Sequence, residues 1–161
     1  MIKIRKLHIK ITLILLIILL AFTVGIPFLV YADMKKQIQI INIDEDMIEN
    51  DKKLIFSIDE QDSQFGYLYI RGWRLRRKYA MDNDFKVALY DCKNKRLIVM
   101  PTCLEARPDV SEKYESDKAV YSSAGFFANL QTSYLKKNKL YELVFVLHGD
   151  KYYYTGVNIT E

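Results

Sequence analysis

The stretch that decides the fold is DFKVALYDCKNKRLIVMPTCLEA, residues 84–106. Apolar side chains at Phe85, Val87 and Leu89 alternate with other residues, so they point to one face of an extended chain. The polar run KNK then supplies a tight turn, and a second extended run follows it. Pro101 lacks a backbone N–H, which places it at an edge or a bulge. A β-hairpin is therefore predicted, with strands over residues 84–92 and 96–106.

Similar patterns occur on both sides of this hairpin. Further strands are predicted over residues 54–60, 65–77, 124–131, 141–149 and 151–160. Gly72 marks a bulge or bend, and Gly149-Asp150 a hairpin turn. Residues 107–123 are predicted to be the longest loop, and residues 133–139 to hold a helical turn. About seven short strands with this spacing predict an all-β fold, an immunoglobulin-like antiparallel β-sandwich over residues 54–161.

An apolar leader precedes the sandwich. Residues 11–32 carry no charge, and about 20 apolar residues are enough to cross a bilayer. The basic residues of the leader all lie before this run, at Lys3, Arg5, Lys6 and Lys10. Since basic flanks stay in the cytoplasm, residues 1–32 are predicted to place the N-terminus inside and the rest of the chain outside.

Two fates of the leader remain open. The length of the apolar run favours a retained single-pass membrane anchor. Gly25 and Pro27 are expected to break the helix, and Val30-Tyr31-Ala32 resembles a cleavage site, which favours secretion after cleavage following Ala32. Residues 33–53 are expected to form a stalk or a short first strand, because Ile38 and Ile40 alternate with polar residues.

The charge balance excludes nucleic acid as a partner. Four of the 24 basic residues lie in the leader, which leaves 20 against 20 acidic residues in the rest of the chain. The net charge of +4 therefore belongs to the leader, and the folded part lacks the basic excess that nucleic-acid binding needs.

Two cysteines occur, Cys92 and Cys103. If both lie on the hairpin of residues 84–106, they sit at different distances from its turn and are too far apart for a disulfide. Both are therefore expected to be free. No histidine lies near either in the sequence, so neither a metal site nor a cofactor is expected.

The sequence also lacks the usual catalytic motifs. It has no glycine-rich phosphate loop, no HExxH and no CxxC, and its two histidines are His8 in the leader and His148 beside a turn. No pair of its many carboxylates stands out as a glycosidase pair. We therefore expect no catalytic residues and a protein that is not an enzyme.

The segment EARPDVSEKY, residues 105–114, has the composition of a structural corner. Pro108 forces Arg107 into an extended conformation, and Asp109 can cap the turn that follows. We favour a structural role for Arg107, in which an acid or loop carbonyl groups hold its guanidinium and so fix the conformation of this corner. The alternative is an exposed arginine that clamps an anion.

Three short motifs resemble a small immunoglobulin-like module that occurs in bacterial cell-envelope and glycosyltransferase-associated proteins. They are Gly72-Trp73-Arg74-Leu75, Arg107-Pro108-Asp109-Val110 and Ser123-Ala124-Gly125-Phe126. The resemblance covers residues 54–159 and implies a non-catalytic accessory fold, without implying a ligand. We expect Gly125 to let the chain turn so that Phe126 enters the core, and Trp73 to be a core residue rather than a sugar platform.

Two groups of residues are candidate ligand contacts. Arg74, Arg76 and Lys78 share one face of a strand, which suits an anionic wall polymer or a lipid headgroup, or simply protects an edge. Tyr152 and Tyr154 share a face of the last strand and are able to stack on sugars or on a protein partner if they point outward.

The expected function is therefore that of a non-enzymatic binding module of the cell envelope. Its partners would be the membrane, through the leader, and a cell-wall glycan, an anionic wall polymer or an envelope protein. A small exported hydrolase of envelope glycans and a membrane-assembly subunit are the alternatives.

Overall fold

The computed structural model describes residues 2–76, 84–114 and 123–160, which fall into two compact units, residues 1–36 and 37–161. The first unit is helical. It consists of α1 (Ile2–Leu20), the π-helical turn η1 (Ala21–Gly25) and the beginning of α2 (Ile26–Gln37). Within the helical stretch Thr12–Gln37, a window of 18 residues reaches a mean hydropathy of 3.0, so this helix is long and apolar enough to cross a membrane.

The prediction that Gly25 and Pro27 break the helix is wrong. Pro27 lies in the first turn of α2, directly after the π-helical turn. A proline ring clashes with the carbonyl four residues earlier in a regular α-helix, and the wider π turn relieves that clash. The helix therefore continues past Ala32 to Gln37.

The second unit is the predicted all-β sandwich, with ten strands among the described residues in place of about seven. The strands are β1 (Gln39–Asn42), β2 (Ile48–Glu49), β3 (Leu54–Gln64), β4 (Tyr67–Arg76), β5 (Lys86–Asp91), β6 (Arg96–Val99), β7 (Thr102–Glu105), β8 (Gly125–Gln131), β9 (Leu140–Leu147) and β10 (Lys151–Thr160). Short 3-10 helices occur at η2 (Glu45–Met47) and η4 (Thr132–Tyr134). The last of these falls in the predicted helical turn.

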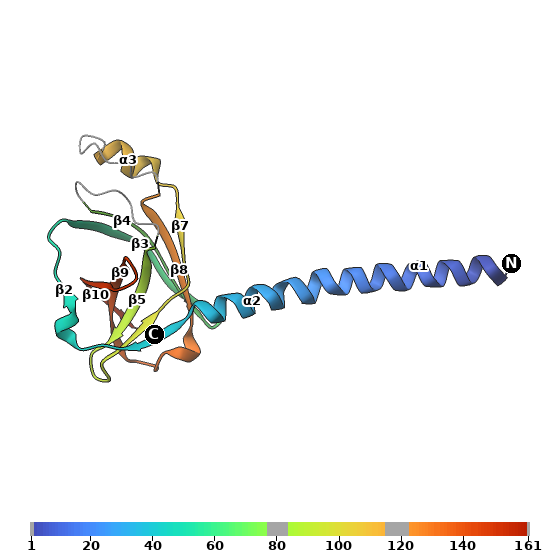
Figure 1. Cartoon of the computed structure of the whole chain (residues 1–161), viewed down its shortest axis with the longest axis horizontal. Coiled ribbons are helices and arrows are strands. Elements are labelled where there is room, and N and C mark those ends of the chain that lie inside the picture. The colour runs from blue at the N-terminus through green and yellow to red at the C-terminus, as the bar shows by residue number, and fades with distance from the viewer. Residues whose placement is uncertain (1, 77–83, 115–122, 161) are drawn as a thin grey trace. The chain divides into compact units, whose positions relative to one another are not determined.

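The strands form two sheets (Figure 1). The four-stranded sheet has the order β3-β4-β8-β7, and the six-stranded sheet has the order β1-β6-β5-β9-β10-β2. Without β1 and β2, these orders match A-B-E-D and C′-C-F-G of the immunoglobulin fold, which confirms the predicted fold class.

The extra strands lie in residues 33–53, which we expected to form a stalk or a short first strand. β1 confirms the short first strand, and β2 was not predicted. β1 pairs antiparallel with β6, and β2 pairs parallel with β10, so both are edge strands of the six-stranded sheet. The sandwich therefore begins near Gln37 rather than at residue 54. Ile43 and Ile48 explain the difference, because both side chains are buried against the sheet.

The predicted strand over residues 96–106 is divided between the two sheets. β6 belongs to the six-stranded sheet and β7 to the four-stranded one, and the chain crosses over at Pro101. The side chain of Thr102 secures the crossing, since its Oγ1 accepts from the N–H of Val87 at 3.0 Å and donates to the carbonyl of Met100 at 3.0 Å. The hairpin that we expected to carry both cysteines is therefore wrong: Cys92 follows β5, Cys103 lies in the other sheet, and both are free and exposed.

The main hydrophobic core fills the space between the sheets. Three phenylalanine rings meet there, with Phe126 and Phe145 separated by 5.5 Å and Phe85 within 5.4 Å of both. Gly72 confirms the predicted bulge. The pairing of β3 with β4 shifts between Ile58 and Glu60, opposite Gly72, and a Cβ atom on Gly72 would lie 2.2 Å from the carbonyl oxygen of Ser57.

Candidate functional site

The outer surface of the four-stranded sheet carries aromatic side chains that remain partly exposed. Tyr69 stacks on Phe127 of the neighbouring strand, with ring centroids 5.8 Å apart, and Tyr67 lies 6.2 Å from Tyr69 on the same strand. We call this surface the open face, defined by the outward residues Tyr67, Tyr69, Arg71, Phe127, Cys103 and Glu105. It combines flat apolar rings with charged groups in one plane.

An ion pair adjoins the aromatic rings on the open face. Nε of Arg71 donates to one oxygen of Glu105 at 2.8 Å, and Nη2 donates to the other at 3.1 Å. This two-point geometry joins β4 to β7 across the intervening strand β8. The hydrogen bonds to Glu105 raise the pKa of Arg71. Because the side chain of Arg71 is 53% exposed, the pair is also accessible to a ligand.

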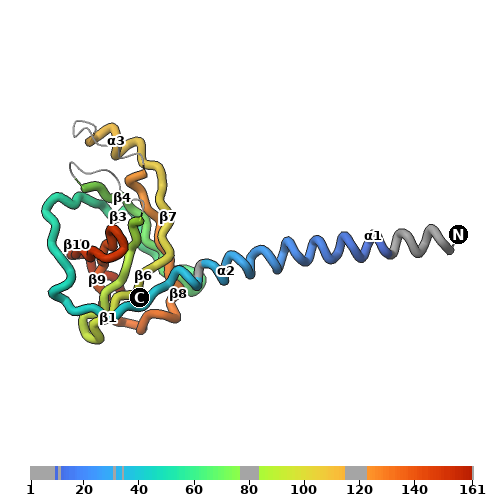
Figure 2. Tube along the Cα trace, in the orientation of Figure 1, coloured from blue at the N-terminus to red at the C-terminus, as the bar shows by residue number. Residues whose placement is uncertain are grey.

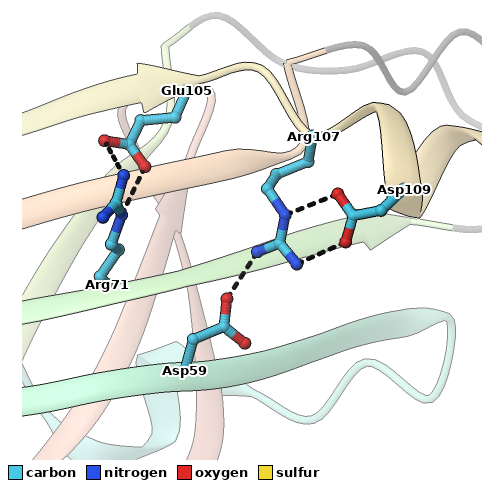
Figure 3. Close-up of polar contacts among 5 residues, drawn as sticks. All are labelled: Asp59, Arg71, Glu105, Arg107 and Asp109. Atoms are coloured by element: carbon cyan, nitrogen blue, oxygen red, sulfur yellow. Dashed lines mark hydrogen bonds and ion pairs between the residues drawn. The ribbon is translucent and has the colours of Figure 1, made fainter.

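Arg107 is the centre of a second ionic cluster (Figure 3). Its Nε and Nη2 atoms donate to the two carboxylate oxygens of Asp109 at 2.8 and 2.7 Å, and its Nη1 donates to Asp59 at 2.5 Å. The pKa of Asp109 is lowered chiefly by these bonds. The expectation that Arg107 is held by an acid is confirmed, and the guanidinium joins the segment after β7 to both α3 (Pro108–Tyr114) and β3.

The position of Asp59 follows from the bulge in β3. Ile58 pairs with Gly72 and Glu60 pairs with Arg71, so Asp59 is the extra residue without a partner in the ladder. A bulge turns one side chain away from the regular alternation of a strand. Here it brings the carboxylate of Asp59 within reach of Arg107.

Gly125 has a different role from the one we predicted. A Cβ atom at this position would lie 2.7 Å from Cγ of Arg107 and 3.0 Å from the carbonyl oxygen of Glu105. Glycine is needed here because the aliphatic stem of Arg107 crosses directly over the backbone of β8, rather than because the chain must turn. Phe126, the next residue, is fully buried in the core, as expected.

A cleft of about 750 Å³ separates the two ionic clusters. Its walls are formed by Asp59, Glu60, Arg71, Glu105, Ala106 and Arg107. Carboxylate oxygens accept hydrogen bonds and guanidinium groups donate them, so the lining offers both functions to a polar ligand. The structure shows no cluster of three or more metal-ligating residues within the described part of the chain.

A short helix covers the end of the open face that lies beyond the cleft. α3 begins at Pro108, which suits the first turn of a helix, and it replaces part of the loop that we predicted over residues 107–123. Trp73 lies 5.9 Å from Tyr114 of this helix and packs against a small cluster that includes Leu75 and Val110. Trp73 is therefore neither in the main core nor free to act as a sugar platform. β7 leads directly into this helix (Figure 2).

The predicted contacts on β4 do not form an exposed basic face. Arg74 is only 2% exposed, and its guanidinium carbon lies 4.0 Å from the centre of the Phe85 ring inside the sandwich. Arg76 is partly buried and donates to Asp51 at 2.6 Å. Lys78 lies outside the described residues. The prediction fails for Arg74 and Arg76 because the face of β4 that they share points inward.

The tyrosines of β10 are not an outward platform either. Tyr152 is 8% exposed and packs on the outer side of the six-stranded sheet with Ile43 and Ile48. Tyr154 is partly buried on the same side, and burial raises the pKa of its hydroxyl. Tyr153 points into the main core. Residues 43–48, within the segment expected to be a stalk or a first strand, cover the two tyrosines that were candidate ligand contacts.

Several contacts of the site were not identified from the sequence. Asp59 required knowledge of the bulge, and Arg71 and Glu105 required knowledge that β4 and β7 flank the same strand. A local signal did exist for the aromatic rings. Tyr67, Tyr69 and Arg71 alternate with the apolar residues of one strand, a pattern typical of a sheet with one solvated face.

Comparison with known proteins adds no further assignment. No family model, no curated protein and no solved structure matches this chain.

Proposed function

We propose that this chain is a membrane-anchored, non-catalytic module of the bacterial cell envelope that binds a glycan through its open face. The observation that carries the proposal is the position of the stacked Tyr69–Phe127 pair next to a cleft lined by carboxylates and guanidinium groups. The sequence motifs that resemble envelope-associated modules point in the same direction.

The chemistry of the open face suits a sugar. Aromatic rings offer a flat apolar surface, which matches the C–H face of a pyranose. Hydroxyl groups both donate and accept hydrogen bonds, so they are able to pair with the carboxylate of Glu60 and with the guanidinium of Arg71. Because the two ion pairs hold Arg71 and Arg107 in place before a ligand arrives, less side-chain entropy is lost on binding.

The same ion pairs argue against a hydrolase. A glycosidase needs one carboxylic acid that is protonated at working pH. In the cleft, the guanidinium of Arg71 binds both oxygens of Glu105, and Arg107 binds Asp59. Hydrogen bonds from arginine already occupy both oxygens of Glu105 and one oxygen of Asp59, which leaves these carboxylates poorly placed to meet a glycosidic oxygen. The cleft is therefore better suited to binding than to bond cleavage.

The continuous helix supports retention of the leader as an anchor. It passes through Ala32, the predicted cleavage point, without a break among the described residues and ends at Gln37. Intact-mass measurement of the protein isolated from membranes tests this part of the proposal. A mature chain that begins at Asp33 would show that the leader is removed.

Glycan binding is tested with the full chain in lipid nanodiscs and a panel of cell-wall glycans and anionic wall polymers. Isothermal titration should identify a glycan that binds, and Tyr69→Ala should lower its affinity about tenfold, the value expected for one lost stacking contact. Phe65→Ala is the matched control, because Phe65 belongs to the same hairpin but lies beyond the open face. Equal affinities of wild type and Tyr69→Ala, or binding of no glycan at all, would overturn the proposal and favour a protein partner.

A further inference from the structure

The turn between β3 and β4 places a bulky ring in an unusual position. Phe65 has a φ angle of 51° and is 94% exposed, and Gly66, which follows it, has a φ angle of 78°. Positive φ at both central residues defines a tight hairpin turn that normally prefers Asn-Gly. A phenylalanine at this position is sterically costly. Since its exposed ring contributes little to the folded state, the cost points to a role outside the fold.

The tip of this hairpin lies at the end of the four-stranded sheet where the chain enters the domain. Gln39, the first residue of β1, pairs with Val99 at the end of β6. Two residues later the chain crosses to the four-stranded sheet at Pro101, and the N–H of Asn129 in β8 donates to the Pro101 carbonyl at 3.2 Å. Gln131 lies farther along β8 than Asn129 and pairs with Tyr67, the first residue of β4.

The contact with the tip itself comes from the next residue. The N–H of Thr132 donates to the carbonyl of Gly66 at 2.8 Å. The start of β1 and the Phe65 tip are thus connected through the same end of β8.

Chain connectivity limits how far this end is able to move from a bilayer. The uncharged run ends at Ala32, and β1 begins at Gln39. Even a fully extended connection between them spans no more than about 25 Å, and a helical one spans about 10 Å. If the leader is anchored, the entry end of the sandwich stays near the membrane surface.

We infer that the Phe65 hairpin is a second membrane contact, in which the phenylalanine ring inserts at the boundary between lipid headgroups and acyl chains. The inference rests on the anchored state proposed above. A lipid bilayer is the occupant that the site suits, because the tip presents an exposed apolar ring at the end of the sandwich that a membrane tether would hold near the bilayer surface. Burying one phenylalanine ring favours the inserted state of a tethered domain by about tenfold over the withdrawn state.

The test uses the full chain in phosphatidylcholine nanodiscs. In a Trp73→Phe background, which removes the only natural tryptophan, Phe65→Trp places a fluorescent reporter at the tip. Met47→Trp is the matched control, since Met47 is also apolar and 53% exposed but lies in η2, which belongs to the segment on the six-stranded sheet. We expect the emission of the Phe65→Trp variant to shift to shorter wavelength and to be quenched by brominated acyl chains, while the Met47→Trp variant shows neither effect.

Unshifted and unquenched emission from the Phe65→Trp variant in folded, disc-incorporated protein would overturn the inference. A second measurement avoids reliance on the Trp73→Phe background. In wild type, spin-labelled lipid should broaden the amide signal of Gly66 more than that of Met47, and equal broadening would also reject a contact at the tip. The outcome is separable from glycan binding, which we expect Phe65→Ala to leave intact, and from loss of the leader, which would prevent incorporation into the discs.

Discussion

The two outer faces of the sandwich differ in almost every respect. The outer side of the six-stranded sheet is a second hydrophobic core, in which Tyr90, Val144 and Tyr152 are buried beneath Ile43 and Ile48. The outer side of the four-stranded sheet carries partly exposed rings, two ionic clusters and a cleft. One face therefore contributes to stability, and the other remains available for recognition.

The segment from β1 through β2 accounts for this difference. It adds an edge strand at each side of the six-stranded sheet and places two isoleucine side chains over the sheet between them. A strand buried on both faces has an almost continuous apolar sequence, whereas a strand with one solvated face alternates. β5 and β4 show these two patterns, respectively. Covering one face of the sandwich leaves the opposite face for a ligand.

The largest expected effect comes from removing a buried aromatic ring from the outer side of the six-stranded sheet, which we call the covered side. Tyr90→Ala should lower the free energy of unfolding by about 3–5 kcal/mol, as is usual for removal of a buried aromatic ring. Tyr69→Ala on the open face should cost clearly less, because its ring is partly exposed. Thermal unfolding of residues 37–161, which contain all three hydrophobic clusters, measures both changes.

Tyr90→Phe is the control for that comparison. The hydroxyl of Tyr90 is buried and has no hydrogen-bond partner among the described residues. Its removal should leave the melting temperature unchanged or raise it, because a buried unpaired polar group is costly. Equal losses for Tyr90→Ala and Tyr69→Ala would contradict the distinction between the two faces.

A smaller effect is expected when the ionic corner beside the open face is broken. Arg107→Ala should lower the free energy of unfolding by about 1–2 kcal/mol, since the guanidinium makes three charge-assisted contacts and is partly buried. Arg71→Ala should have less effect, because its ion pair is largely exposed. An unchanged melting temperature for Arg107→Ala would show that this corner does not stabilise the fold.

The smallest effect concerns Glu142 on the covered side. Burial, assisted by the charge of Glu45, raises the pKa of Glu142. A raised carboxyl pKa means that the folded state binds the proton more tightly, so the group lowers stability once the pH rises above its unfolded pKa of about 4.3. Glu142→Gln should therefore raise the melting temperature modestly at pH 7 and have little effect near pH 4. A gain of equal size at both pH values would show that ionisation is not the cause.

The fold could be predicted because strand patterns are local. Alternation in β3 and β4, the short apolar run of β5 and the hairpin before β10 indicate a sandwich from local sequence alone. The uncharged run of residues 11–32 likewise indicated a helix that can span a bilayer. The corner at Arg107 could also be anticipated, because proline and neighbouring charges restrict the chain at short range.

The site depended on tertiary structure. Periodicity places Arg74 on one face of β4 and Tyr152 on one face of β10. It does not show whether such a face points inward or is covered, and in the structure both predicted ligand contacts are buried. Asp59 meets Arg107 only because of a bulge, and Arg71 meets Glu105 only because β4 and β7 flank β8. The sequence alone determined most of the segments that form strands and which segment is apolar enough for a membrane. The pairing of distant strands decided which side chains are exposed, because long-range contacts and not local spacing determine burial.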